Sequence, residues 1–258
     1  MIKAAFFDID WTLYDHAAQR YVPSGIEAVK KLKENGVRVF ICSARPFNSM
    51  DLFGIFNLGI PWDGYIASAG AVAVVDGVTV RKLLMEKKDV TAIINKMNEL
   101  GRTLEFVTPT ERFLTAPADQ YVESYHWVYQ YQQPEVRTYT NEECTGMLLF
   151  IPEELDEEVR SVCPSLAWYR FHESGVDISG VPHEKGEAIQ SILDYLGIKK
   201  EESISFGDDF QDISMANATG IFVAMGNGKE EVKQVADYVT DRIEEDGLEK
   251  ALKHFKLI

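Results

Sequence analysis

Two aspartates, Asp8 and Asp10, flank a single isoleucine directly after the apolar segment AAFF. Aspartate is unfavourable in a strand and costly to bury without a partner, so this placement calls for a chemical reason. A carboxylate can act as a nucleophile, as a proton donor and acceptor, or as a metal ligand. On a flat strand the two side chains would share one face, whereas a chain that curls after Asp8 would let them approach a substrate from different directions.

Polar residues also follow three other apolar segments. Ser43 follows VRVFIC, Ser68 follows DGYIA, and Asp208 follows SISFG. Any one of them reads most simply as the cap of a following helix. Four such residues, Asp8 included, at the carboxyl ends of strands of one sheet indicate a ligand site instead.

The acids Asp8, Asp208 and Asp212 would repel one another in such a site unless a cation joins them. Carboxylates together with waters and a phosphate oxygen are the usual surroundings of Mg²⁺. The sequence therefore favours a magnesium site.

The segments that must position these side chains alternate between helix and strand patterns. In the first third, helices are expected at 23–36 and 45–56, and strands at 37–42 and 63–71. The last third continues this alternation from the amphipathic segment 185–197 to a closing helix at 244–255. Such an order predicts an α/β fold, a Rossmann-like doubly wound parallel sheet with right-handed crossovers.

The middle of the chain has a different pattern. Longer helical segments, 89–101 and 152–163, are mixed with alternating strand-like segments at 103–108, 147–152, 166–171 and 175–180. We expect an α+β domain at 82–182, inserted into a core formed by 1–81 and 183–258.

Composition limits the class of protein. The chain has 258 residues, 46% hydrophobic and 26% charged, as in an ordinary globular protein, and a net charge of −15. That charge argues against binding to nucleic acid or to an anionic membrane surface. Three scattered cysteines and the absence of a signal peptide or an apolar run of membrane-spanning length favour a cytoplasmic protein.

Four short motifs carry a resemblance to a known family. Together with the tail segments VAMGNGKEEVKQVADYVT and EEDGLEKAL, their order resembles that of the haloacid dehalogenase (HAD) superfamily of phosphohydrolases, in its Cof-like branch. The inserted domain lies where that branch carries its type IIB cap. The motifs are DIDWT, ICSAR, EKGEAI and GDDFQDISM.

The resemblance implies the roles of the acids. Asp8 would be the nucleophile that forms an aspartyl phosphate and would also bind Mg²⁺. Asp10 would be the general acid and base, with its backbone carbonyl on the metal. Asp208 would complete the metal site, and Asp212 would support it directly or through water.

It also implies a phosphate site. Ser43 and Lys185 would bind the transferring phosphoryl group, and Thr12 would help to hold the loop. Arg45 would contact either the substrate or the cap, although an ion pair is an equal alternative. Mg²⁺ and Lys185 would supply the positive charge that phosphoryl transfer needs in an acidic protein.

Four residues depart from the commonest Cof-like pattern. Trp11 and Ala44 stand where glycine is usual, Ala69 stands at an asparagine position, and Gln211 replaces another asparagine. None of the four removes a nucleophile, a proton carrier or a metal ligand.

The sequence thus favours a Mg²⁺-dependent phosphatase that acts on a small phosphorylated metabolite, with sugar phosphates as the first candidates. A phosphomutase with the same aspartyl phosphate is an alternative, and so is a phosphometabolite-binding regulator without turnover. A dehalogenase fits less well, because Asp10 and the metal acids suit phosphate.

Overall fold

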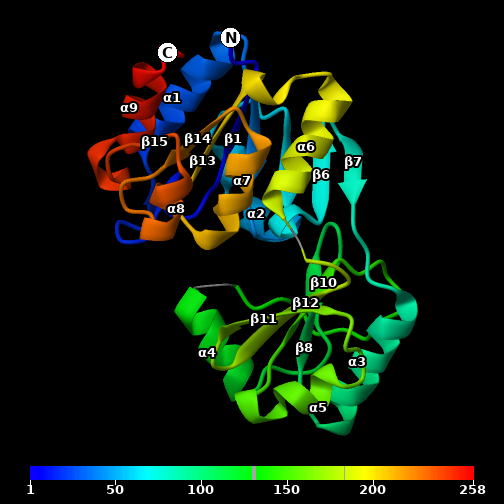
Figure 1. Cartoon of the computed structure of the whole chain (residues 1–258). Helices are drawn as coiled ribbons and strands as arrows, with labels where there is room; N and C mark the ends of the chain where they lie inside the picture. The colour runs from blue at the N-terminus through cyan, green and yellow to red at the C-terminus, as the bar shows by residue number, and fades with distance from the viewer. Residues whose placement is uncertain (130–131, 183) are drawn as a thin grey trace. The chain divides into compact units, whose positions relative to one another are not determined.

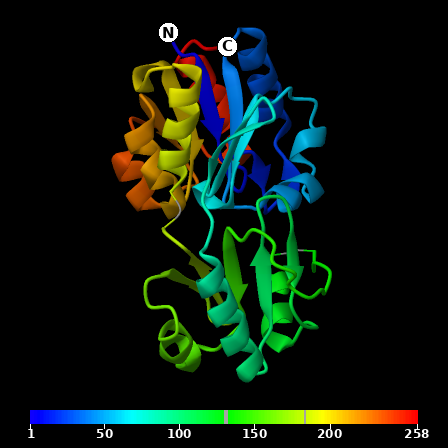
Figure 2. The same ribbon diagram turned by 90° about the vertical axis from the view of Figure 1, so that its right-hand side faces the viewer.

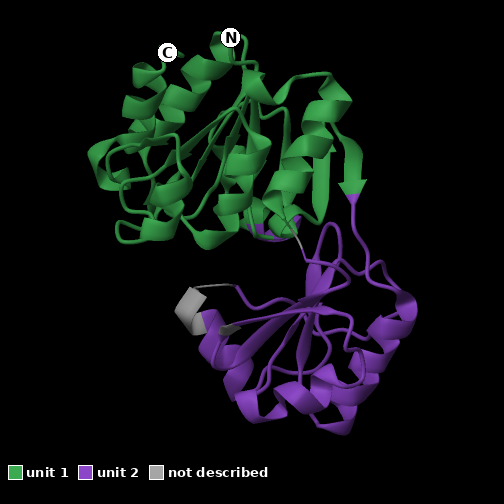
Figure 3. Cartoon of the chain, in the orientation of Figure 1, with its two compact units in different colours: residues 1–45, 50–81, 184–258 green, residues 46–49, 82–183 purple. Residues whose placement is uncertain are grey.

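The computed structural model describes residues 1–129, 132–182 and 184–258 (Figure 1). The described chain divides into two compact units, coloured separately in Figure 3. Unit 1 comprises 1–45, 50–81 and 184–258, and unit 2 comprises 46–49 and 82–183. The chain therefore leaves unit 1, builds unit 2, and returns.

Unit 1 is built on an eight-stranded sheet with β1 and β4 at its centre. The strand order is β15-β14-β13-β1-β4-β5-β6-β7. The strands are β1 (Ala4–Phe7), β4 (Arg38–Cys42), β5 (Gly64–Ala67), β6 (Val72–Val75), β7 (Val78–Lys82), β13 (Ser203–Gly207), β14 (Ile221–Ala224) and β15 (Tyr238–Val239).

Helices cover both faces of this sheet (Figure 2). On one face, apolar side chains of α6 to α8 join those of β1 and β4 in a buried core. On the other face, α1 packs against β4 and α9. The helices of unit 1 are α1 (Pro23–Glu34), α6 (Lys185–Leu196), α7 (Ile213–Ala218), α8 (Glu230–Val235) and α9 (Gly247–His254). Helix α2 (Phe47–Leu52) is divided between the two units.

The register of β1 brings the site residues to one edge. Phe7, the last residue of β1, lies opposite Phe206 of β13 and Ile41 of β4, and both pairings are parallel. The carboxyl ends of these three strands therefore meet at one edge of the sheet, where a ligand site was expected.

The predicted doubly wound α/β core is confirmed, with one addition. Strands β6 and β7 extend the sheet beyond β5, and β6 runs antiparallel to β5. The turn that joins them is Asp76-Gly77, and both residues have positive φ. The Asp-Gly pair is a strong hairpin signal that the sequence interpretation missed.

Unit 2 is an antiparallel sheet with helices on it. The strand order is β11-β12-β10-β8-β9. Helices α3 and α5 contribute to the apolar core on one face, and α4 packs through Val122 and Tyr125 against Leu114 and Phe150. The elements are α3 (Lys87–Glu99), β8 (Leu104–Val107), β9 (Arg112–Leu114), α4 (Gln120–Tyr129), β10 (Gly146–Leu149), α5 (Asp156–Arg160), β11 (Ala167–His172) and β12 (Gly175–Ser179).

The sequence interpretation placed the return to the core at residue 183, which lies outside the described residues. Among the residues that the structure does describe, no helix combines the length and apolar character needed to cross a membrane.

Candidate active site

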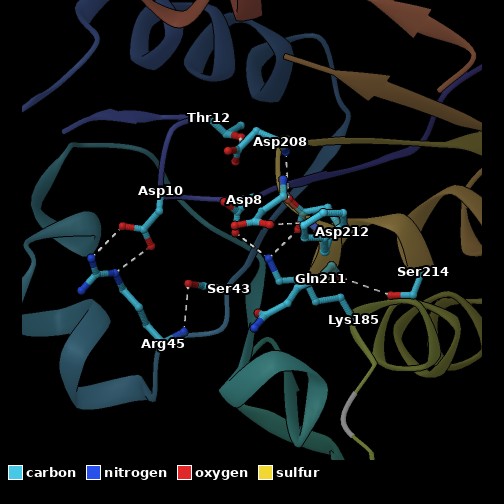
Figure 4. A network of polar contacts seen from close by, with 12 residues as sticks. Asp8, Asp10, Thr12, Ser43, Arg45, Lys185, Asp208, Gln211, Asp212 and Ser214 are labelled. Carbon is cyan, nitrogen blue, oxygen red and sulfur yellow. Dashed lines mark hydrogen bonds and ion pairs between the residues drawn. The ribbon is translucent and has the colours of Figure 1, made fainter. Parts of the chain in front are cut away.

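The loop that follows β1 turns back on itself. The backbone N–H groups of Leu13 and Tyr14 donate hydrogen bonds to the carbonyl of Ile9, at 2.9 and 2.8 Å. Of the two arrangements that the sequence left open, the structure has the curled one. Figure 4 shows the consequence, because Asp8 and Asp10 direct their carboxylates to different partners.

Asp8 and Asp212 share one ammonium group. Lys185 Nζ, at the start of α6, donates to Asp8 Oδ1 and to Asp212 Oδ1, both at 2.6 Å. All three side chains are buried. Although burial opposes its charge, the two carboxylates raise the pKa of Lys185 well above its usual value. Lys185 therefore remains an ammonium ion beside Asp8.

The second oxygen of Asp212 organises the loop after β13. Asp212 Oδ2 accepts hydrogen bonds from the backbone N–H groups of Asp208 and Asp209, at 2.9 and 3.0 Å. Gly207 makes this approach possible, because a Cβ at that position would lie 2.5 Å from the Asp212 side chain. Both oxygens of Asp212 are thus engaged by the protein.

Asp8, Asp208 and Asp212 form a compact acidic cluster. One oxygen from each lies within 4.8 Å of the others, and all three residues are buried. Three carboxylates face one ammonium, Lys185, which leaves two negative charges uncompensated (−3 + 1 = −2).

Protons balance this excess charge when no cation is bound. Burial, opposed by Lys185 and reinforced by Asp212, raises the pKa of Asp8 to about 8. Burial and then the charges of Asp8 and Asp212 raise the pKa of Asp208 to about 9. Hard oxygen donors with two surplus charges fit a divalent cation such as Mg²⁺.

Asp10 lies outside that cluster and accepts from two cationic or polar side chains. Arg45 donates from Nε to Oδ2 at 2.9 Å and from Nη2 to Oδ1 at 2.7 Å. His16 Nε2 lies 2.6 Å from Oδ1. Although burial opposes ionisation, these hydrogen bonds hold the pKa of Asp10 well below its usual range. Asp10 is therefore a carboxylate in this arrangement.

The remaining predicted residues lie around the same edge. Ser43 is buried, and its Oγ accepts from the backbone N–H of Arg45 at 3.1 Å. Thr12 Oγ1 donates to Asp208 Oδ1 at 3.4 Å. The backbone of Ser68, after β5, donates to the carbonyl of Arg45 at 2.9 Å and so supports that loop from the next strand.

The four departures from the family pattern have different environments. Trp11 and Ala69 have left-handed backbone conformations, with φ of 59° and 53°. Ala44 and Gln211 are exposed. In the part of the chain that the structure describes, none of the four makes a side-chain hydrogen bond with Asp8, Asp10 or Asp208.

The sequence interpretation missed His16. It lies in the same N-terminal stretch as Asp8, but it has no partner at a recognisable metal-ligand spacing. Its contact with Asp10 depends on the turn after β1 and on the short strands β2 (Tyr14–Asp15) and β3 (Arg20–Tyr21), which no periodicity predicts.

Comparison with known proteins places this arrangement in a family. The model of the haloacid dehalogenase-like hydrolases matches residues 5–252. A Bacillus subtilis protein with a provisional phosphatase name, YkrA, is 29% identical over 262 residues, covering 99% of this chain and 98% of its own.

Two solved structures are similar over their whole length. A hypothetical protein from Geobacillus kaustophilus HTA426 has a TM-score of 0.92 at 31% identity, with 100% of both chains covered. The HAD subclass IIB sugar phosphatase BT4131 has a TM-score of 0.79 at 34% identity, covering 99% of this chain and 100% of that one. The family expected from the four motifs is confirmed: the chain belongs to the haloacid dehalogenase-like hydrolases, in the Cof-like branch.

Proposed function

We propose that this protein is a Mg²⁺-dependent phosphatase that hydrolyses small phosphomonoesters through an aspartyl phosphate, with sugar phosphates as the first substrates to test. The observation that carries the proposal is the buried cluster of Asp8, Asp208 and Asp212, two of whose members, Asp8 and Asp212, share the Lys185 ammonium. The similarity to the sugar phosphatase BT4131 supports the substrate class. In this proposal residues 82–182 are the cap domain, which sets substrate choice.

Asp8 and Asp208 would hold the metal ion with side-chain oxygens, and Asp10 with its backbone carbonyl. Asp212 would support the ion through water, since Lys185 and two backbone N–H groups already engage its oxygens. The bound ion would neutralise charge on the phosphoryl oxygens and keep the acids ionised.

In the first half-reaction a carboxylate oxygen of Asp8 attacks phosphorus, and the bond from phosphorus to the ester oxygen breaks. Asp10 transfers a proton to that leaving oxygen. Lys185, Ser43 and Thr12 stabilise or frame the phosphoryl group, whose charge lies on its equatorial oxygens. Arg45 is engaged by Asp10 in this structure, so its part in substrate binding requires that contact to loosen.

In the second half-reaction Asp10, now a carboxylate, takes a proton from water. The oxygen of that water bonds to phosphorus, the bond to Asp8 breaks, and orthophosphate leaves. The contacts from Arg45 and His16 favour the carboxylate form that this step needs. To act as the acid in the first step, Asp10 must be protonated, and it must therefore lose some of these hydrogen bonds.

The test is phosphate release from a panel of small phosphomonoesters, with Mg²⁺ and with a chelator. Wild type is compared with Asp8→Asn, which keeps the shape of the side chain but removes the nucleophilic oxygen. Asp76→Asn is the matched control, because Asp76 is an exposed acid whose left-handed backbone conformation asparagine tolerates.

We expect metal-dependent release that is lost in Asp8→Asn and kept in Asp76→Asn. An absence of phosphate release from every ester would contradict the proposal. In that case isomer formation would indicate a mutase, and tight binding without turnover would indicate a regulator.

A further inference from the structure

A short contact joins His16, six residues further along the chain, to Asp10. Because an ionised carboxylate only accepts hydrogen bonds, His16 Nε2 must carry the hydrogen of the 2.6 Å contact with Asp10 Oδ1. Arg45 Nη2 donates to the same oxygen at 2.7 Å. The orientation of the Asp10 carboxylate is therefore fixed by two side chains from different segments.

The His16 ring is held by aromatic neighbours. Its centroid lies 5.3 Å from the Trp11 ring, 4.9 Å from Tyr14 in an edge-on geometry, and 6.3 Å from Phe53. Phe53 also lies under the Arg45 guanidinium, 4.0 Å from ring centroid to Cζ. The Phe53 ring thus contacts both of the side chains that hydrogen-bond Asp10.

Trp11 is the unexpected member of this group. Its φ of 59° is unusual for a bulky residue, and glycine would adopt it without strain. The backbone is secured there, because Trp11 N–H donates to the Tyr14 carbonyl and Asn227 Nδ2 donates to the Trp11 carbonyl, both at 2.9 Å. The contact between the indole ring and His16 is a structural reason for a tryptophan at this position of the loop.

We propose that His16 is a positioning residue for Asp10 and that Trp11 holds the His16 ring in place. This inference rests on the proposed phosphatase function, in which Asp10 moves a proton in both half-reactions. A proton carrier must lie within hydrogen-bond reach of the reacting oxygen, and a partner that fixes its orientation preserves that geometry. Among the residues that the structure describes, the side chains that hydrogen-bond the Asp10 carboxylate are His16 and Arg45, so loss of His16 would leave its orientation to Arg45.

The experiment compares two substrates in wild type and His16→Ala. One is the best alkyl phosphate of the panel, whose leaving oxygen needs a proton. The other is p-nitrophenyl phosphate, whose leaving group needs none. For the alkyl phosphate we expect kcat/KM to fall about a hundredfold, as misplacement of a catalytic group does.

For p-nitrophenyl phosphate we expect kcat/KM and kcat to change by different amounts in His16→Ala. Formation of the aspartyl phosphate no longer depends on Asp10, so kcat/KM should change less than about threefold. Hydrolysis of the intermediate still needs Asp10 as base, so kcat should fall about tenfold or more, with a burst of p-nitrophenol. General damage to the site would not produce this split.

Three further variants complete the test. His16→Gln retains an N–H donor and should restore most of the activity on the alkyl phosphate. For Trp11→Gly, kcat/KM on the same substrate should lie between the values of wild type and His16→Ala. His254→Ala is the control at an exposed histidine and should match wild type.

An active wild type whose His16→Ala variant is unchanged, or loses kcat and kcat/KM equally on both substrates, overturns the inference alone. A wild type inactive on every ester overturns the proposed function and this inference with it.

Discussion

Each compact unit buries a cluster of charged side chains, and the two clusters are balanced differently. In unit 1, Asp8, Asp208 and Asp212 face the single ammonium of Lys185. In unit 2, the cluster consists of Glu105, Arg112 and His126.

In the unit 2 cluster the charge of the carboxylate is balanced by a guanidinium of the protein itself. Arg112 Nη1 donates to Glu105 Oε1 at 2.9 Å, and His126 Nε2 lies 3.3 Å from Glu105 Oε2. These residues come from β8, β9 and α4, so the cluster fastens the helix to the sheet. One buried carboxylate with a guanidinium partner is electrically complete.

The unit 1 cluster is incomplete, and that difference indicates which cluster does chemistry. A buried charge without a partner is costly, so two surplus carboxylates must be neutralised by protons or by a cation, and such perturbed acids are typical of functional sites. The following predictions test whether an unbalanced cluster marks a reactive site and a balanced one a structural element.

Removal of Lys185 should have the largest effect. Lys185→Met deletes the ammonium beside Asp8, the proposed nucleophile, and we expect kcat/KM for the best substrate to fall about a thousandfold, as when a preorganised electrostatic partner is lost. The measurement is steady-state kinetics with Mg²⁺, with circular dichroism to verify the fold. Lys233→Met, at a surface pair with Glu230, is the control and should keep full activity. Retention of more than about a tenth of the activity in Lys185→Met would break the comparison.

Glu105→Gln should affect stability rather than chemistry. It leaves the buried Arg112 without its charged partner, so the free energy of unfolding should fall by about 3 kcal/mol. Urea denaturation followed by circular dichroism measures this loss. Glu111→Gln, at an exposed pair with Arg137, should cost less than about 1 kcal/mol. If Glu105→Gln instead abolished turnover in a folded protein, the unit 2 cluster would not be only structural.

Magnesium should stabilise the protein more as pH rises. Folding raises the pKa of Asp8 to about 8 and of Asp208 to about 9, from an ordinary value of 3.8. Such groups stabilise the fold at low pH, and this contribution is lost as pH rises through the folded pKa values. A cation can take the place of the lost protons, so the stabilisation of the fold by bound Mg²⁺ should increase over the same pH range.

At a magnesium concentration about a hundredfold above Kd we expect Tm to rise by about 5 °C at pH of about 8.5, and by much less at about pH 6. The measurement is the difference in Tm between samples with Mg²⁺ and with a chelator at the same pH. Groups that do not bind the metal titrate equally in both samples, so their effect on Tm cancels. Asp208→Asn should reduce the shift. An equal shift at both pH values would show that protons and metal do not compete at these acids.

Sequence patterns predicted the parts of this molecule that depend on local order. The alternation of helix and strand segments predicted the doubly wound core, and the order of four motifs predicted the family, which the match over residues 5–252 confirms. Periodicity also predicted β8, β10, β11 and β12 of unit 2. The three-residue strand β9 was missed, because so short a segment has no measurable period.

Contacts between side chains were predicted less well. The sequence left Arg45 open between a substrate contact and an ion pair, and the structure pairs it with Asp10. The contact of His16 with Asp10 was not foreseen, nor was the sharing of Lys185 by Asp8 and Asp212. The Arg45 and Lys185 contacts depend on how distant segments meet, and the His16 contact depends on the tight turn after β1. Neither propensity nor spacing encodes these arrangements.

The smallest expected effect concerns backbone conformation rather than charge. Ala69 follows β5 with φ of 53°, and its N–H donates to the Ser43 carbonyl at 3.1 Å, so its strained conformation supports the site. Asparagine, usual at this place in the Cof-like pattern, tolerates the left-handed region better than alanine. We therefore expect Ala69→Asn to raise the free energy of unfolding by about 0.5 kcal/mol and to change kcat less than about threefold.

Urea denaturation and steady-state kinetics of Ala69→Asn and Ala69→Gly separate backbone from side chain. Glycine relieves the same strain without a polar group, but it gains more conformational freedom in the unfolded chain, so its net effect should be near zero. If asparagine raised kcat about tenfold while glycine did not, the amide itself would act in catalysis. The unbalanced charges of unit 1 would then not be the whole of its reactive site, and alanine at this position would be a functional difference from the family rather than a small cost in stability.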